Sequence, residues 1–149
     1  MGVTIKRAGA DDLDVLVPLF DAYRQFYRQA SDPAAARKFL GERIRNNQSV
    51  IFVAFVSSAA AGFTQLYPSF SSGLMARIFV LNDLFVVPEA RRNGVGVALL
   101  NAAADYGRRQ GAVRLTLSTE LSNATAQALY EKTGWRRDNV FCVYNQSLG

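Results

Sequence analysis

The pattern of apolar and polar residues organises the chain around one stretch, from Ile78 to Ala104. Its first ten residues are apolar except for Asn82 and Asp83, which predicts a buried strand. Pro88 ends that strand, because proline cannot donate to a ladder. A basic turn with two glycines follows at 91–96, and helical spacing then links the apolar positions Val95, Leu99, Ala102 and Tyr106. This order favours an anion site, because glycine lets the backbone approach and the first helical N–H groups attract negative charge. The alternative is an ordinary turn whose glycines serve packing.

The remaining pattern predicts alternating elements on both sides of this stretch. Strands are expected over 3–8, 50–56, 62–67 and 113–117, with one long or two short strands over 135–147. Helices are expected over 11–27, from Pro33 to a turn at 46–48, and over 123–132, with a turn at 57–61 and a loop at 68–73. Pro18 should bend or break the first helix near Val17. The order β-α-α-β-β-β-α-β-α-β predicts a mixed α+β fold in a single domain over 1–149.

Composition narrows the chemistry that the chain can perform. Its 149 residues are half hydrophobic and 19% charged, which suits one globular domain, and no apolar run approaches the ~20 residues of a membrane helix. The N-terminal residues lack the apolar core of a signal peptide, and the single cysteine, Cys142, fits a reducing cytoplasm. Without histidine, a serine or cysteine triad is excluded as usually built, and no metal site is expected. The net charge of +5 suits a polyanionic ligand such as CoA, and its spread over the sequence does not favour nucleic acid.

Three segments together resemble the GNAT superfamily of N-acetyltransferases over nearly the full chain. They are the strand Asn-Asp-Leu-Phe-Val-Val-Pro-Glu at 82–89, the turn Arg-Arg-Asn-Gly-Val-Gly at 91–96, and the segment from Thr119 to Trp135. The first of these, with Tyr-x-x-Phe-Tyr at 23–27 and Glu-x-x-Asn at 120–123, looks closest to the branch that contains polyamine, histone and D-amino-acid N-acetyltransferases. The resemblance implies a mostly antiparallel twisted sheet with a V-shaped splay, flanked by helices. The resemblance is also compatible with a homodimer.

The same resemblance implies acetyl-CoA as co-substrate and identifies residues that would bind it. Backbone groups of the central strand would hold the pantetheine arm, and N–H groups of the glycine turn would hold the pyrophosphate. The expected binding residues are Leu84, Phe85, Val86, Arg91, Arg92, Asn93, Gly94, Val95, Gly96, Val97, Asn123 and Tyr130. For Arg91 and Arg92 the alternative is a solvated basic turn.

Catalysis by direct attack needs an acid for the CoA thiolate and a base for the substrate ammonium. Tyr130 matches the position of the family's general acid, seven residues after Asn123 on the same helix side. A core tyrosine is the alternative. Asn82 stands where several polyamine enzymes carry a glutamate, so Asp83 and Glu120 remain as candidate bases, acting directly or through water. Asp83 has a purely structural alternative, because buried polar groups in strands often cap a bulge.

The acceptor is expected to be a small primary amine, a polyamine or an amino acid. Tyr23, Phe26 and Asn82 would bind it beside the two carboxylates, with the first helix and the 68–73 loop as the rim. The positive charge and the missing glutamate favour an acceptor that also carries a carboxylate. Three alternatives stay open: a non-catalytic acyl-CoA sensor, an acetyltransferase of protein lysines or N-termini, and a nucleic-acid-binding module. Transfer through an acetylated Cys142 is disfavoured, because an apolar final strand offers it no base.

Overall fold

A computed structural model describes residues 2–149. They form two compact units, and the boundary between the units in the sequence lies between Ser118 and Thr119. The first unit holds a five-stranded sheet in the order β1-β2-β3-β4-β5. Its strands are β1 (Val3–Arg7), β2 (Val50–Val56), β3 (Ala59–Ser71), β4 (Ala76–Val86) and β5 (Leu115–Thr116). Its helices are α1 (Leu13–Phe26), α2 (Pro33–Arg45) and α3 (Val95–Arg109), with short 3-10 turns at Ala10–Asp12 and Pro88–Ala90. The second unit contains α4 (Ala124–Lys132).

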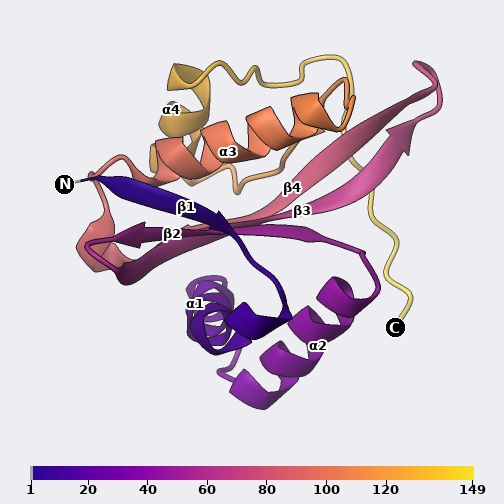
Figure 1. The fold of residues 1–149 in the computed structure, drawn as a ribbon. Helices are drawn as coiled ribbons and strands as arrows, with labels where there is room; N and C mark the ends of the chain where they lie inside the picture. Colours follow the sequence, from indigo (N-terminus) through magenta and orange to yellow (C-terminus); the bar gives the residue numbers. More distant parts are fainter. Residues whose placement is uncertain (1) are drawn as a thin grey trace. The chain divides into compact units, whose positions relative to one another are not determined.

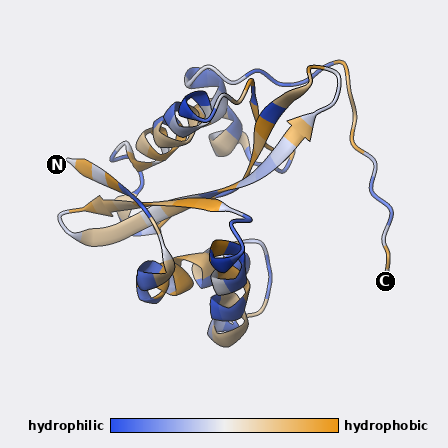
Figure 2. Ribbon diagram, turned by 45° about the vertical axis from the view of Figure 1, so that its right-hand side comes forward, coloured by the Kyte–Doolittle hydropathy of each residue, from blue (hydrophilic) through white to orange (hydrophobic). Residues whose placement is uncertain are grey.

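The sheet is antiparallel except at its last pair, where β5 runs parallel to β4. Helices α1 and α2 cover one face of the sheet and α3 covers the other (Figure 1). Figure 2 shows the central strands as largely apolar, whereas the helices carry both apolar and polar stripes. Side chains of α1 and α2 pack on the sheet in one buried cluster, which includes Leu16, Phe20, Leu40, Ile51, Val53, Phe63 and Phe85. The mixed fold predicted from the element order is confirmed, and so is the mostly antiparallel sheet that the resemblance implies.

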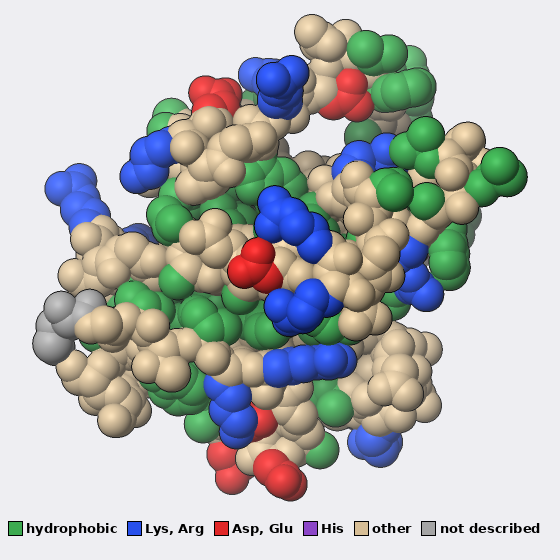
Figure 3. Space-filling view, turned by 45° about the horizontal axis from the view of Figure 1, so that its top comes forward, with side chains coloured by type: hydrophobic (Ala, Val, Ile, Leu, Met, Phe, Trp, Pro, Cys, Tyr) green, Lys and Arg blue, Asp and Glu red, His purple; other side chains and the backbone are tan. Residues whose placement is uncertain are grey.

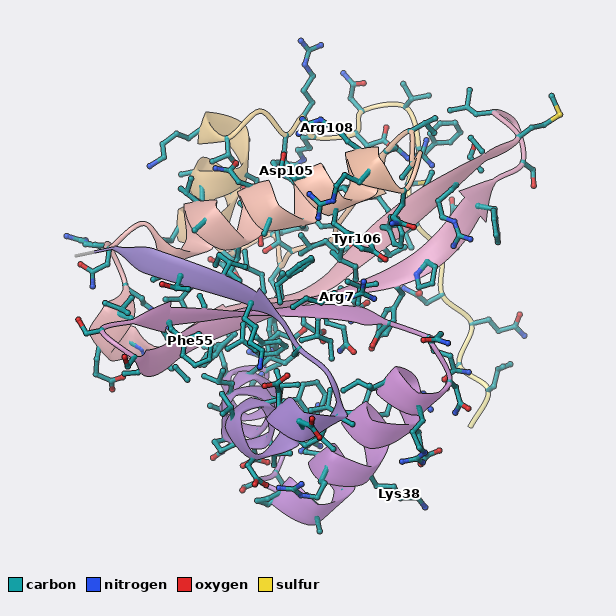
Figure 4. All side chains as sticks on the ribbon, viewed as in Figure 1. Arg7, Lys38, Phe55, Asp105, Tyr106 and Arg108 are labelled. Atoms are coloured by element: carbon teal, nitrogen blue, oxygen red, sulfur yellow. The ribbon has the colours of Figure 1, made fainter. Side chains whose placement is uncertain are left out.

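The opposite face of the sheet is joined to α3 by aromatic contacts. Tyr106 of α3 packs edge-on against Phe52 and Phe79, with ring centroids 5.8 and 5.5 Å apart. Arg7 of β1 points toward the same ring, its guanidinium carbon 5.0 Å from the centroid (Figure 4). A cation over an aromatic face is attracted by the ring quadrupole, so this contact adds to the packing of α3 on the sheet.

Helix α1 continues unbroken through Pro18, so the break considered from the sequence does not occur. Proline removes the hydrogen bond to the carbonyl four residues earlier, which belongs to Asp14. Both Asp14 and Pro18 are exposed, so water can satisfy that carbonyl. The buried side of the helix carries Leu16, Leu19 and Phe20. The hydrogen bond lost at Pro18 therefore lies on the opposite side, which is exposed to solvent.

The loop predicted at 68–73 is wrong, because β3 runs on to Ser71 and the hairpin turn lies at 72–75. Pro68 is tolerated because β2 pairs with β3 only as far as Leu66, which leaves β3 with β4 as its neighbour there. The turn expected at 57–61 shrinks to Ser57 and Ser58, both at positive φ, as a tight hairpin requires. The 113–117 strand shortens to β5.

The predicted strand or strands over 135–147 are also wrong, since the structure has no strand in that segment. The Asp138 carboxylate accepts the backbone N–H groups of Val140 and Phe141 at 2.8 and 3.1 Å. Such a local turn competes with strand pairing. The apolar side chains that suggested a strand are exposed, and Cys142 is an exposed free thiol instead of a residue in an apolar strand.

No helix among residues 2–149 combines the length and the apolar character that crossing a bilayer requires.

Candidate active site

The end of β4 and the start of α3 form the first half of the candidate site. The ladder between β4 and β5 contains only Phe79 and Val80, so β4 continues to Val86 with β3 as its only ladder partner. This short ladder with the two-residue β5 stops where the resemblance implies a splay. It leaves one edge of Leu84, Phe85 and Val86 outside any described ladder, which is where an extended ligand could add as a strand.

Gly94 makes the turn from this strand into α3. Its φ of +78° lies in the left-handed region, and a Cβ placed there would have no described atom within 4 Å. No side chain caps the helix, and the first intrahelical bond runs from Ala98 N to Gly94 O. The N–H groups of Val95, Gly96 and Val97 therefore have no partner inside the helix, and they sit at the positive end of its dipole. This is the backbone arrangement that binds phosphate.

The two arginines before Gly94 have different local settings. Arg91 folds back onto the preceding strand, where its Nε donates to the Val86 carbonyl at 3.1 Å. Arg92 is exposed and has a φ of +69°, so the turn itself holds a strained non-glycine residue. Asn93 is exposed between them and Gly94. The alternative considered from the sequence was that both arginines belong to a solvated basic turn. It fits the exposed Arg92 better than Arg91, which is bonded to the Val86 carbonyl.

Asp83 forms the second half of the candidate site, on the α1–α2 face of the sheet. Its side chain is 2% exposed. One carboxylate oxygen accepts from Gln65 Nε2, and the other accepts from Asn82 Nδ2 at 2.9 Å. A register shift opposite Gln65 makes Asn82 the extra residue of a β-bulge, which leaves its side chain exposed while Asp83 stays buried. The bulge considered as a structural alternative is present, but within residues 2–149 the carboxylate accepts from the side-chain amides of Gln65 and Asn82 and does not cap the backbone of the bulge.

Burial raises the pKa of Asp83 above its usual value, while hydrogen bonds from Asn82, Gln65 and Tyr23 oppose the rise. Tyr23 has a raised pKa because it is buried and lies beside this carboxylate. The pKa of Tyr67 rises to about 12 for the same two reasons, and the positive charge of Arg43 opposes that rise. Asp83 is thus a carboxyl whose affinity for a proton is increased, as a general base requires.

The aromatic side chains at the end of α1 lie partly in the core and partly at the candidate site. Tyr23 lies over Phe63 and Phe85, at ring centroid distances of 5.7 and 6.4 Å, and its hydroxyl donates to the Asn82 carbonyl at 3.3 Å. Phe26 is 49% exposed and packs against Tyr27. Tyr23 therefore lies beside Asn82 and Asp83, as expected, whereas the ring contact of Phe26 is with Tyr27.

The second unit holds the remaining predicted residues. Asn123 caps α4, its Oδ1 accepting from Ala126 N at 3.1 Å. The Glu120 carbonyl accepts from Asn123 N and from Gln127 Nε2, which ties the approach segment to the first turn of the helix. Tyr130 lies two turns further on, 6.0 Å from the Trp135 ring. The capped helix and the spacing from Asn123 to Tyr130 are as predicted.

Sequence reasoning missed the partners of Asp83. Gln65 is a fully buried amide in an otherwise apolar strand, and its Oε1 has no hydrogen-bond partner among the described residues. Arg43, from α2, has a buried Nε that likewise lacks a described partner, and its guanidinium carbon lies 4.6 Å from the Phe39 ring centroid. The signal available in the sequence was the polar pair Thr64 and Gln65 inside the run Gly-Phe-Thr-Gln-Leu-Tyr at 62–67.

Figure 3 shows how charged side chains lie on one face of the described residues. Several Lys and Arg side chains lie close together near the centre of this face around an acidic side chain, and other basic side chains lie apart from them toward the edges.

Comparison with known proteins identifies the class to which this fold and site belong. Residues 16–135 match the model of the "Acetyltransferase (GNAT) family". The chain is 50% identical over 142 residues to the uncharacterized N-acetyltransferase YhfO of Bacillus subtilis, covering 95% of each protein. A crystal structure of a probable acetyltransferase is 42% identical, with a TM-score of 0.93 and 98% of each chain covered. The aminoglycoside N-acetyltransferase AAC(6′)-Iy, solved in complex with CoA, is 18% identical, with a TM-score of 0.82 over 97% of this chain and 95% of that one.

The fold of this chain matches that of a probable acetyltransferase, and the relative from Bacillus subtilis is named as an N-acetyltransferase. The chain belongs to the GNAT family of acetyltransferases. It is an acetyltransferase enzyme, as the motifs at 82–96 and 119–135 predicted.

Proposed function

We propose that this protein is a single acyltransferase domain over residues 1–149 that moves an acetyl group from acetyl-CoA to the primary amine of a small molecule. The observation that carries the proposal is the uncapped N-terminus of α3, entered through a left-handed Gly94 at the end of the unpaired part of β4. Family membership supports the donor, as does the fold shared with an acetyltransferase that was solved with CoA.

The donor would be held mainly by backbone groups. N–H groups from Arg92 to Val97 suit its pyrophosphate, and Arg91 adds charge beside them. The open edge of Leu84, Phe85 and Val86 suits the two amides of its pantetheine arm. Asn123 keeps the α4 start in place, with Tyr130 further along the helix. Acetyl-CoA supplies a thioester that an amine can attack directly.

Two proton transfers accompany that attack, and the chain has a group for each. The Tyr130 hydroxyl serves as the acid that protonates the departing thiolate. Asp83 serves as the base, because burial raises its affinity for a proton. Glu120 is the second carboxylate proposed at this site. A bound water between carboxylate and ammonium is an equivalent route.

The acceptor would lie against Tyr23, Phe26 and the bulge at Asn82. The net positive charge favours an acceptor that carries a carboxylate beside its amine, and Arg43 supports this choice. Its guanidinium is partly exposed on the same face of the sheet as Asp83, close enough to Tyr67 to affect its pKa. Free amino acids therefore rank above polyamines as acceptors.

The test is a comparison of kcat/KM for spermidine and for a panel of free amino acids, measured by thiol release from acetyl-CoA. Wild type should prefer an amino acid. Asp83→Asn and Glu120→Gln should each change the ratio among acceptors, because each removes a negative charge that an ammonium group would feel. If neither variant changes the ratio, these carboxylates do not line the acceptor site.

A further inference from the structure

The proposed base has a problem of access. Asp83 is 2% exposed, and both of its oxygens already accept hydrogen bonds from amides. A diffusing ammonium group cannot reach a carboxylate that is covered in this way without displacing its neighbours. A group that touches both Asp83 and the surface would remove the problem.

Tyr23 is such a group. It is half-buried, so part of its side chain faces solvent while its hydroxyl lies at the bulge, 3.3 Å from the Asn82 carbonyl. The Asp83 carboxylate lies beside this hydroxyl, which acts together with Asn82 and Gln65 against the rise that burial causes in the pKa of Asp83. Its single hydrogen can point to either acceptor, and the oxygen keeps a lone pair for an incoming N–H donor. The ring is fixed by edge contacts with Phe63 and Tyr27, at 5.7 and 5.1 Å between centroids.

We propose that Tyr23 relays the acceptor's proton to Asp83. This inference rests on the proposed function and adds a catalytic residue to it. The acceptor ammonium donates an N–H proton to the Tyr23 oxygen while the Tyr23 O–H bond breaks and its proton passes to the Asp83 carboxylate. The products are a neutral amine, ready to attack, a neutral tyrosine and a protonated Asp83. No charge is left on the phenol at any stage.

The relay must be concerted, because a free phenolate at this position is strongly disfavoured. Burial and the Asp83 charge both raise the pKa of Tyr23, so the tyrosine cannot act as the base itself. The other polar groups that face the pair are Gln65 and Asn82, which bind the carboxylate, together with Tyr67 and Tyr27. These four side chains carry no positive charge. A cation, Arg43, lies on the same face and acts on Tyr67, but it is not among the causes that shift the pKa of Asp83 or of Tyr23.

Tyr67 supplies a matched control within the same cluster. It is also a half-buried tyrosine that feels the Asp83 charge, and no hydrogen bond to that carboxylate is among the causes of its raised pKa. Tyr23→Phe and Tyr67→Phe therefore delete the same atom near the same carboxylate. Only the first deletion breaks the relay.

The experiment measures kcat and the acceptor KM for both variants and for Asp83→Asn, using the best amino-acid acceptor of the wild type. Tyr23→Phe should lower kcat by ~10²-fold or more with little change in acceptor KM, which is the usual range for a lost proton-transfer group. Tyr67→Phe should stay within about twofold of wild type. The double variant Tyr23→Phe with Asp83→Asn should lose no more than the worse single variant, since both act in one step.

A second measurement tests the contact between Tyr23 and Asp83 without enzymatic turnover. Carboxyl ¹³C NMR titration should show a higher pKa for Asp83 in Tyr23→Phe than in wild type, because a hydrogen bond to the carboxylate is gone. Equal loss of kcat in the two tyrosine variants, an effect on KM alone, or an unchanged Asp83 titration would overturn the relay. A wild type that binds CoA but acetylates no amine would overturn the proposed function itself, and the relay with it.

Discussion

The Gly94→Val variant tests the anion site at the α3 N-terminus. A valine at a second left-handed glycine separates the effect of backbone strain from the effect of lost ligand binding. Gly94 has a φ of +78°, and Gly111, at the other end of the same helix, has a φ of +74°. A Cβ at either position meets no described atom within 4 Å. The two valine variants should therefore lose similar stability, on the order of 1–2 kcal/mol for a left-handed non-glycine residue. Thermal denaturation of both variants checks this equality.

Only Gly94→Val should weaken CoA binding. A side chain there blocks the approach of an anion to the helical N–H groups, and a hydrogen bond to a charged group contributes about 1.5–3 kcal/mol. Loss of one such bond raises Kd by roughly tenfold or more. Isothermal calorimetry with CoA should show this rise for Gly94→Val and a wild-type Kd for Gly111→Val. Equal affinity in all three proteins would refute the placement of the pyrophosphate.

Three further predictions test the scaffold and the acid. Gly62→Ala should destabilise the protein by about 1–3 kcal/mol in urea unfolding, because its Cβ would lie 2.4 Å from a backbone carbonyl oxygen of β4, whereas Gly73→Ala, in open space, should be close to neutral. Tyr130→Phe should lower kcat by ~10²–10⁴-fold and leave CoA affinity near wild type, and unchanged turnover with chemistry rate-limiting would remove Tyr130 from the mechanism. The pKa of Asp21 is lowered by hydrogen bonds from Ser31 Oγ and a backbone N–H, so its carboxylate stabilises the fold at neutral pH and loses that effect as pH falls through the lowered value. Asp21→Asn should accordingly cost stability at pH 7 and less at pH 3, and a constant difference would contradict the assignment.

Local signals were enough to predict most elements of the fold. The run before Pro88, the positive-φ glycine of the turn and the helical spacing after it identify β4 and α3, because each depends on residues close in sequence. The extent of β3 depends instead on where β2 ends, which decides whether Pro68 lacks a needed donor. The strand predicted over 135–147 failed for a related reason, since alternation indicates an extended backbone but supplies no partner.

The candidate site shows the same division. Asp83 could be singled out as a polar interruption in an apolar run, and its neighbour Asn82 as a departure from the family pattern. Their opposite exposures follow from a bulge that is visible only in the register with β3. Gln65 and Arg43 were not predicted, because their link to Asp83 and Tyr67 comes from three elements that meet in space.

The most direct test of the account is to incubate wild-type protein with acetyl-CoA and a panel of small primary amines and to measure free thiol and N-acetylated product together. The account predicts that thiol and one acetylated amine appear in equal amounts, with an amino acid as the preferred acceptor. Thiol release without any acetylated amine, or CoA binding without thiol release, would contradict it.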